Sequence, residues 1–99
     1  MYFTYIIRCK DNSLYTGYTS DIKRRMEEHK QGINCKYSRA RGFQSLEVYF
    51  SSNTRSKAMK LESYIKKHTK TKKNWIINNP ECFVEALENS VEYAVGTDY

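Results

Sequence analysis

An arginine and a histidine lie four residues apart in a predicted helix that begins near Asp21. The apolar seam of that helix is Ile22 and Met26, and both Arg25 and His29 flank it. Arg25 is therefore the charged side chain of this helix that is aimed towards the protein body. Such an arginine either covers apolar surface with its stem or belongs to a functional site. The spacing leaves both interpretations open.

Glu62 raises the same question in a second predicted helix. It lies at the edge of an apolar face made by Ala58, Leu61 and Ile65. A carboxylate in this position usually forms a structural ion pair, and the spacing favours that interpretation. The alternative is a divalent metal ligand, because Mg²⁺ keeps most of its waters and needs few protein ligands.

Tyrosine is unusually frequent, with nine among 99 residues. Tyr5 and Tyr15 fall on two strands that are predicted to pair. One interpretation is core packing with each hydroxyl at the rim of the core. The other is that two phenols converge beside the first helix. A phenol has an ordinary pKa of about 10, so it acts as a base or a proton relay only beside cations or a metal-bound water.

The elements that must position these groups follow the order ββα-β-αα. Strands are expected at 2–9 and 14–19, joined by a polar turn, and a third at 46–50. A helix capped by Thr19 or Ser20 should run to about Lys30 and stop at Gly32, and residues 34–44 should form a basic loop. Two further helices are expected, one from Asn53 or Thr54 to about His68 and one over 72–78. This pattern predicts an α/β (α+β) fold: a small three-stranded antiparallel sheet flanked by helices. Beyond Pro80 we expect a helix-like piece and a weakly ordered end.

The charge is divided sharply along the chain. All seventeen basic residues lie between Arg8 and Lys73, where six acidic residues leave a charge of +11. Residues 74–99 hold five acidic residues and no basic one, giving −5 and a net charge of +6. A basic body of this size favours a polyanionic partner. No helix shows a basic face opposite a bulky apolar one, so nucleic acid is favoured over a membrane surface.

Several classes of protein are excluded by composition. No apolar run approaches the roughly 18 residues that span a membrane, and the start lacks the pattern of a signal peptide. Three cysteines without CxxC spacing argue against a disulfide framework or a zinc site. The sequence therefore predicts a reduced, cytoplasmic protein without a membrane partner.

Five segments in order resemble the GIY-YIG nuclease domain, in particular its small stand-alone bacterial members. They are YIIRC at 5–9, SLYTG at 13–17, DIKRRMEEH at 21–29, YSRAR at 37–41 and AMKLE at 58–62. The resemblance covers roughly residues 2–77. We therefore predict a GIY-YIG-like nuclease domain over 1–79 and an acidic C-terminal extension over 80–99, which packs Phe83 and Leu87 on the body while its acids weaken non-specific binding.

The resemblance implies a role for each group described above. Tyr5 and Tyr15 match the two motif tyrosines, Arg25 the catalytic arginine, His29 a histidine of several members, and Glu62 the metal-binding glutamate. It implies an endonuclease that hydrolyses phosphodiester bonds of DNA with one divalent ion, Mg²⁺ or Mn²⁺. Tyr5 is favoured as the group that activates water, assisted by Tyr15 or His29.

The partner predicted by the resemblance is nucleic acid, DNA in preference to RNA, in DNA repair or recombination. A protein partner that supplies specificity is also compatible with a chain this short. The alternatives are a non-catalytic nucleic-acid-binding module and a partner-dependent nuclease subunit with the same fold. The residues expected to contact nucleic acid are basic or aromatic and lie in two segments: Lys36, Tyr37, Arg39, Arg41, Lys66, Lys67 and Lys70.

Overall fold

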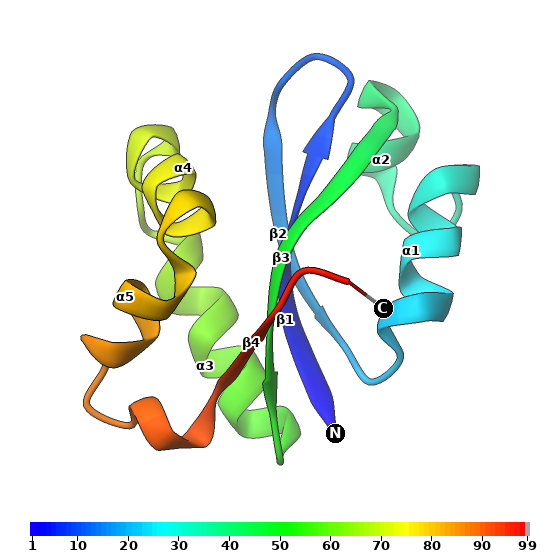
Figure 1. The fold of residues 1–99 in the computed structure, drawn as a ribbon. Coiled ribbons are helices and arrows are strands. Elements are labelled where there is room, and N and C mark those ends of the chain that lie inside the picture. The colour runs from blue at the N-terminus through cyan, green and yellow to red at the C-terminus, as the bar shows by residue number, and fades with distance from the viewer. Residues whose placement is uncertain (99) are drawn as a thin grey trace.

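The computed structural model describes residues 1–98 and contains a four-stranded antiparallel sheet with helices on both faces (Figure 1). The strands are β1 (Tyr2–Cys9), β2 (Leu14–Thr19), β3 (Phe43–Ser52) and β4 (Ala94–Gly96), in the order β2-β1-β3-β4. The predicted class, an antiparallel sheet flanked by helices, is confirmed. The predicted count of three strands is wrong, because β4 adds a fourth.

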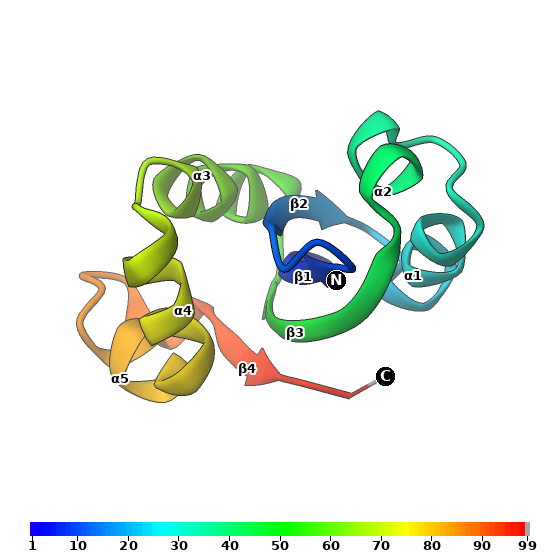
Figure 2. The same ribbon diagram turned by 90° about the horizontal axis from the view of Figure 1, so that it is seen from above.

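The helices form two layers, one on each face of the sheet (Figure 2). One layer holds α1 (Ile22–Gln31) and α2 (Lys36–Arg41). The other holds α3 (Arg55–Lys66), α4 (Lys70–Asn78) and α5 (Pro80–Glu85), and a short 3₁₀ turn over Ser90–Glu92 leads into β4. Strand β2 is an edge strand of the sheet, so one side of it is open between the two layers.

The local sequence explains where the helices begin and end. Asp21 is the cap of α1, because its carboxylate accepts a hydrogen bond of 3.1 Å from the backbone N–H of Arg24. The cap predicted at Thr19 or Ser20 is therefore one or two residues too early. Gly32 ends α1 in the left-handed conformation, as predicted, and Thr54 caps α3.

The stretch 34–44, predicted to be a loop, contains the six-residue helix α2. Its cap residue Cys35 makes no side-chain cap hydrogen bond, and its first turn holds no acidic residue. A helix this short gives no measurable periodicity in the sequence. It is held instead by tertiary contacts, among them the buried side chain of Ser38.

Strand β3 is longer than predicted, and the tail is more ordered than predicted. β4 pairs antiparallel with β3, with Ala94 opposite Ser51 and Gly96 opposite Tyr49. Gly96 is required there, because an added Cβ would lie 2.5 Å or less from the Tyr49 ring. The weakly ordered end is therefore a strand for three residues.

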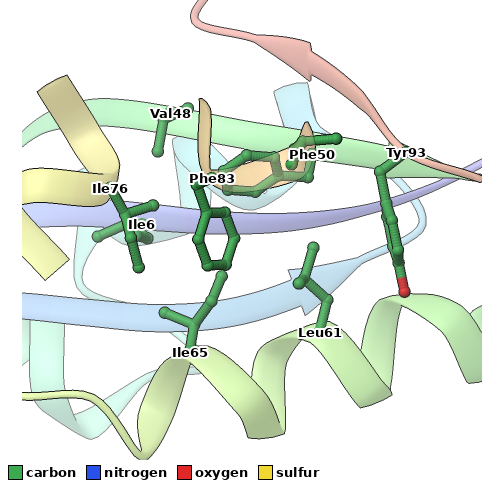
Figure 3. Close-up of a cluster of buried hydrophobic side chains, with 9 residues drawn as sticks. Ile6, Val48, Phe50, Leu61, Ile65, Ile76, Phe83 and Tyr93 are labelled. Atoms are coloured by element: carbon green, nitrogen blue, oxygen red, sulfur yellow. The ribbon is translucent and has the colours of Figure 1, made fainter. Parts of the chain in front are cut away.

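The larger hydrophobic core lies between the sheet and the layer of α3, α4 and α5 (Figure 3). Side chains alternate along β1, so Ile6 faces this core while Tyr5 and Ile7 face the smaller core under α1 and α2. Burying each large apolar side chain contributes roughly 1.5–3 kcal/mol. The core residues are Ile6, Val48, Phe50, Leu61, Ile65, Ile76, Phe83, Val84 and Tyr93.

The acidic tail contributes to this core. Phe83 and Val84 of α5 and Tyr93 are buried in it, and Leu87 packs against it, which confirms the predicted packing of Phe83 and Leu87. The division of the chain into a domain over 1–79 and an extension over 80–99 stays a prediction. The last residue of that extension, Tyr99, lies outside the described residues. None of the helices within residues 1–98 has the length and apolar character needed to cross a membrane.

Candidate active site

Two tyrosine side chains meet over one glycine at the open edge of the sheet. Tyr5 on β1 pairs with Gly17 on β2, and Tyr15 precedes Gly17 by two residues on the same face. A Cβ at Gly17 would lie 2.6 Å from the Tyr5 hydroxyl oxygen and 3.1 Å from the Tyr15 ring. The missing side chain therefore lets both phenols lie against the backbone.

The Tyr5 hydroxyl belongs to a buried hydrogen-bonded chain. It lies 2.7 Å from Nε2 of His29, and Nδ1 of His29 lies 2.9 Å from the Ser38 hydroxyl. Arg25 donates to the Tyr5 oxygen, and the Ser38 hydroxyl lies 3.4 Å from the Cys35 carbonyl; both contacts favour the tautomer of His29 with its proton on Nδ1, donated to Ser38. The Nε2 atom is then the acceptor, and the Tyr5 O–H donates to it. Tyr5, His29 and Ser38 are each at most 1% exposed.

Burial sets the protonation states of this chain. It raises the pKa of Tyr5 well above the ordinary value, although the hydrogen bond from Arg25 opposes the rise. Burial, followed by the positive charge of Arg25, lowers the pKa of His29 to about 4. At neutral pH both Tyr5 and His29 are therefore neutral, and the lone pair on Nε2 of His29 accepts the hydrogen bond from the Tyr5 hydroxyl.

Arg25 lies against this chain. Its Nε donates to the Tyr5 hydroxyl at 3.3 Å, Nη1 to Glu28 at 2.9 Å and Nη2 to the Asn34 carbonyl at 3.1 Å. The side chain is 17% exposed. Its guanidinium is thus held at the edge of the site by three partners, in the direction that the helix spacing predicted.

Glu62 lies on the other side of β2, on α3. Its carboxylate lies 3.6 Å from Nζ of Lys66, so the ion pair favoured by the spacing is present. Lys66 Nζ also lies 5.9 Å from the centre of the Tyr15 ring. Burial is the largest cause of the raised pKa of Tyr15, and the charge of Glu62 contributes to it. Glu62, Lys66 and Tyr15 therefore lie close together beside the edge strand β2.

Glu62 fits a magnesium ligand better than a zinc ligand. Among residues 1–98 there is no group of three or more histidine, cysteine, aspartate or glutamate side chains able to enclose an ion. Mg²⁺ is commonly held by one or two carboxylates, its waters and substrate phosphate. The Glu62 side chain is 19% exposed and its partner Lys66 is 49% exposed, so the carboxylate is accessible to a cation from solvent.

The predicted nucleic-acid contacts divide into free and engaged side chains. Arg41 donates to Asp11 at 2.7 Å and lies 4.6 Å over the Tyr37 ring. Tyr37 itself packs 5.2 Å from the Tyr15 ring and donates to the Leu14 carbonyl at 3.2 Å. Lys66 pairs with Glu62. The remaining predicted cations are exposed and form no ion pair within residues 1–98: Lys36 and Arg39 on α2, and Lys67 and Lys70 around the junction of α3 and α4.

Two further groups at the site were not predicted. The role of Ser38 cannot be predicted when residues 34–44 are taken as a loop, because it depends on the helix α2. The one indication in the sequence is that Ser38 belongs to the YSRAR segment. Gly17 was part of a quoted motif, but its role depends on how close Tyr5 comes across the strand pair.

The chain is similar to known proteins in sequence and in fold. Residues 1–74 match the sequence model of the GIY-YIG catalytic domain. A UPF0213 protein of Fusobacterium nucleatum is 41% identical over 88 residues, which are 89% of this chain and 88% of that protein. The UPF0213 protein YazA of Bacillus subtilis is 38% identical over 91 residues, covering 92% and 85% of the two chains. A solution NMR structure of a UPF0213 protein from Bacillus halodurans is 38% identical, with a TM-score of 0.51 over 79% of this chain and 84% of that one.

Proposed function

This chain belongs to the family of GIY-YIG catalytic domains, a family of nucleases, and from that premise we propose that it is a metal-dependent endonuclease that hydrolyses phosphodiester bonds of DNA. The observation that carries this proposal is the shared hydroxyl of Tyr5, which donates to His29 and accepts from Arg25. It joins a proton acceptor and a fixed cation at one oxygen. In the hydrolysis of a phosphodiester, the acceptor takes the proton of the attacking water and the cation stabilises the charge that grows on the phosphate.

The proton path follows from the hydrogen-bond directions. Because burial disfavours the Tyr5 phenolate, Tyr5 acts as a relay and not as a resting base. The attacking water gives its proton to the Tyr5 oxygen while the Tyr5 proton passes to Nε2 of His29. The water oxygen forms the new bond to phosphorus, and the ester bond to the leaving oxygen breaks. The leaving oxygen takes up a proton from solvent, and His29, whose pKa is about 4, returns its proton through Tyr5, so the products are a phosphate monoester and a free hydroxyl.

Arg25 stabilises the negative charge that grows on the non-bridging oxygens. Its planar guanidinium matches a phosphate in two-point geometry, and a fixed cation of this kind contributes roughly 10²–10³-fold to a rate. The phosphate must compete with Glu28 for the same guanidinium, now 2.9 Å away. As Arg25 turns to the phosphate, the Tyr5 hydroxyl beneath it becomes accessible to the attacking water.

Glu62 is the residue that would hold the divalent ion, and its partner Lys66 lies 5.9 Å from the centre of the Tyr15 ring. A bound Mg²⁺ or Mn²⁺ supplies Lewis-acid stabilisation of the scissile phosphate and of the leaving oxygen. The pair of Lys66 and Glu62 is a partly exposed contact at 3.6 Å, so giving up the carboxylate to a cation would cost little.

The test is the nicking of supercoiled plasmid by purified protein with Mg²⁺ or Mn²⁺. Wild type is compared with Arg25→Ala and Glu62→Ala, each expected to lose about 100-fold or more of the rate. Equal nicking by all three proteins would reject this site. Salt-sensitive DNA binding without nicking by any of them would favour the alternative, a non-catalytic binding module.

A further inference from the structure

A basic cleft lies beside the C-terminal end of β2, where Tyr18 and Thr19 line it. It has a volume of about 470 Å³ and lies between the start of α1 and the start of α3. None of the nucleic-acid contacts predicted from the sequence is in it. Its principal lining side chains are Tyr2, Tyr18, Arg24, Arg25, Glu28 and Arg55.

The cleft has an excess of positive charge. Three arginines line it, and the carboxylate of Glu28 pairs with only one of them, Arg25. Within the part of the chain that the structure describes, neither Arg24 nor Arg55 forms an ion pair, and both are exposed. Two guanidinium charges are therefore available to an anion.

Arg55 is oriented by a group that does not neutralise it. Both Nε and Nη2 of Arg55 donate to the Tyr18 hydroxyl, at 3.2 and 3.0 Å. Tyr18 is fixed in β2, opposite Thr4 of the central strand. A carboxylate in the place of the Tyr18 hydroxyl would neutralise the guanidinium of Arg55. A neutral hydroxyl holds the fork and leaves three of its five N–H groups unused by Tyr18.

The cleft is continuous with the candidate active site, because Arg25 belongs to both. Arg25 lines the cleft and also donates to the Tyr5 hydroxyl. We propose that Arg24 and Arg55, the latter positioned by Tyr18, bind a phosphate of the substrate strand adjacent to the phosphate held by Arg25. This subsite rests on the proposed function in taking nucleic acid as the ligand and Arg25 as the residue that holds the neighbouring phosphate. The strand then follows the open edge of β2 from this cleft towards Lys66.

The test is the salt dependence of binding to a fluorescent DNA duplex, measured by anisotropy. Each lost phosphate contact reduces the slope of log K against log salt by about 0.9. We expect that loss for Arg55→Gln and for Arg24→Gln. Lys23→Gln is the matched control, because it removes one charge from an exposed position of α1 that does not line the cleft.

Tyr18→Phe separates positioning from charge. It removes the hydroxyl and keeps the strand side chain, so affinity should fall several-fold in the wild-type background. It should have no further effect when Arg55 is already glutamine. A Tyr18→Phe loss that is equal in both backgrounds would contradict the positioning role.

The outcomes distinguish this subsite from the proposed nuclease. The subsite would be overturned if wild type, Arg24→Gln and Arg55→Gln gave equal salt slopes. It would also be overturned if Lys23→Gln reduced the salt slope as much as they do. Either result would leave the active site to be tested by the nicking assay. The expected slopes in a protein that never nicks DNA would support the subsite and reject the nuclease. A wild type without salt-sensitive binding would overturn both.

Discussion

The hydroxyl of Tyr5 lies 2.7 Å from Nε2 of His29, and no part of the histidine is exposed. The two residues come from different layers of the molecule, β1 in the sheet and α1 above it. Ser38 fixes the opposite nitrogen of the ring, and Arg25 caps the hydroxyl. The pair therefore has a defined proton direction before any substrate binds.

Tyr5→Phe removes the relay oxygen and keeps the ring that fills the core. We expect nicking to fall by about 100-fold or more, since a positioned proton-transfer group contributes roughly 10²–10⁴-fold. Tyr49→Phe is the matched control, because Tyr49 lies opposite Tyr5 on β3 but its hydroxyl donates to the carbonyl of the exposed Asp98 and not to His29. Equal rates for the two variants would contradict the relay.

Ser38→Ala leaves Nδ1 of His29 without its buried acceptor. We expect the free energy of unfolding to fall by about 1–3 kcal/mol, with a loss of nicking as the ring loses its fixed tautomer. Ser38→Thr keeps the hydroxyl and should retain most of the activity. Urea denaturation and the plasmid assay measure both effects, and an alanine variant as stable and active as wild type would refute this role.

The depressed pKa of His29 predicts how stability changes with pH. The folded value is about 4, and an unfolded histidine titrates near 6.5. Between these values the unfolded chain binds more protons, so this contribution is fully present above about pH 6.5 and is lost as the pH falls towards 4. Carboxylates also titrate at acid pH, so His29→Gln is compared with wild type by urea denaturation at pH 7, 5.5 and 4.5. The variant should lose less stability over that range; an equal loss would show that His29 does not carry it.

Gly17→Ala should damage the site. The added Cβ would lie 2.6 Å from the Tyr5 hydroxyl oxygen, so the Tyr5 ring or the backbone of β2 must shift. We expect the free energy of unfolding to fall by about 1–3 kcal/mol. We also expect a large loss of nicking, because the Tyr5 hydroxyl is displaced. Gly96→Ala is the matched control: it meets the Tyr49 ring just as closely but lies at β4, away from the site. It should lower stability while leaving the nicking rate of the folded protein near that of wild type.

The acidic tail should weaken non-specific DNA binding through charge. Deleting residues 80–99 does not test this, because Phe83, Val84 and Tyr93 belong to the core and their loss would unfold the protein. Glu81, Glu85 and Glu88 are exposed, so changing all three to glutamine keeps the packing. We expect tighter DNA binding at low salt and little difference at high salt, measured by anisotropy. Unchanged affinity at low salt would contradict the role.

Much of the architecture could be predicted because it is encoded over short distances. The strand pair 2–9 and 14–19, the stop at Gly32 and the buried faces of α1 and α3 follow from side-chain periodicity and capping chemistry. The helix α2 and the strand β4 could not be predicted in this way. Six and three residues are too few to show a period, and both elements depend on partners distant in the sequence, such as His29 and Tyr49.

The sequence by itself determined which groups are available for chemistry and on which helix faces and strands they lie: Tyr5, Tyr15, Arg25, His29 and Glu62. Spacing along a helix or strand specifies a direction, and direction is a local property. Only the tertiary structure decided which of these groups touch, that burial keeps Tyr5 and His29 neutral, and that Tyr18 holds Arg55 beside the basic cleft. Those properties depend on distance and on exclusion of water between segments far apart in the chain, and both arise only when the two helical layers pack on the sheet.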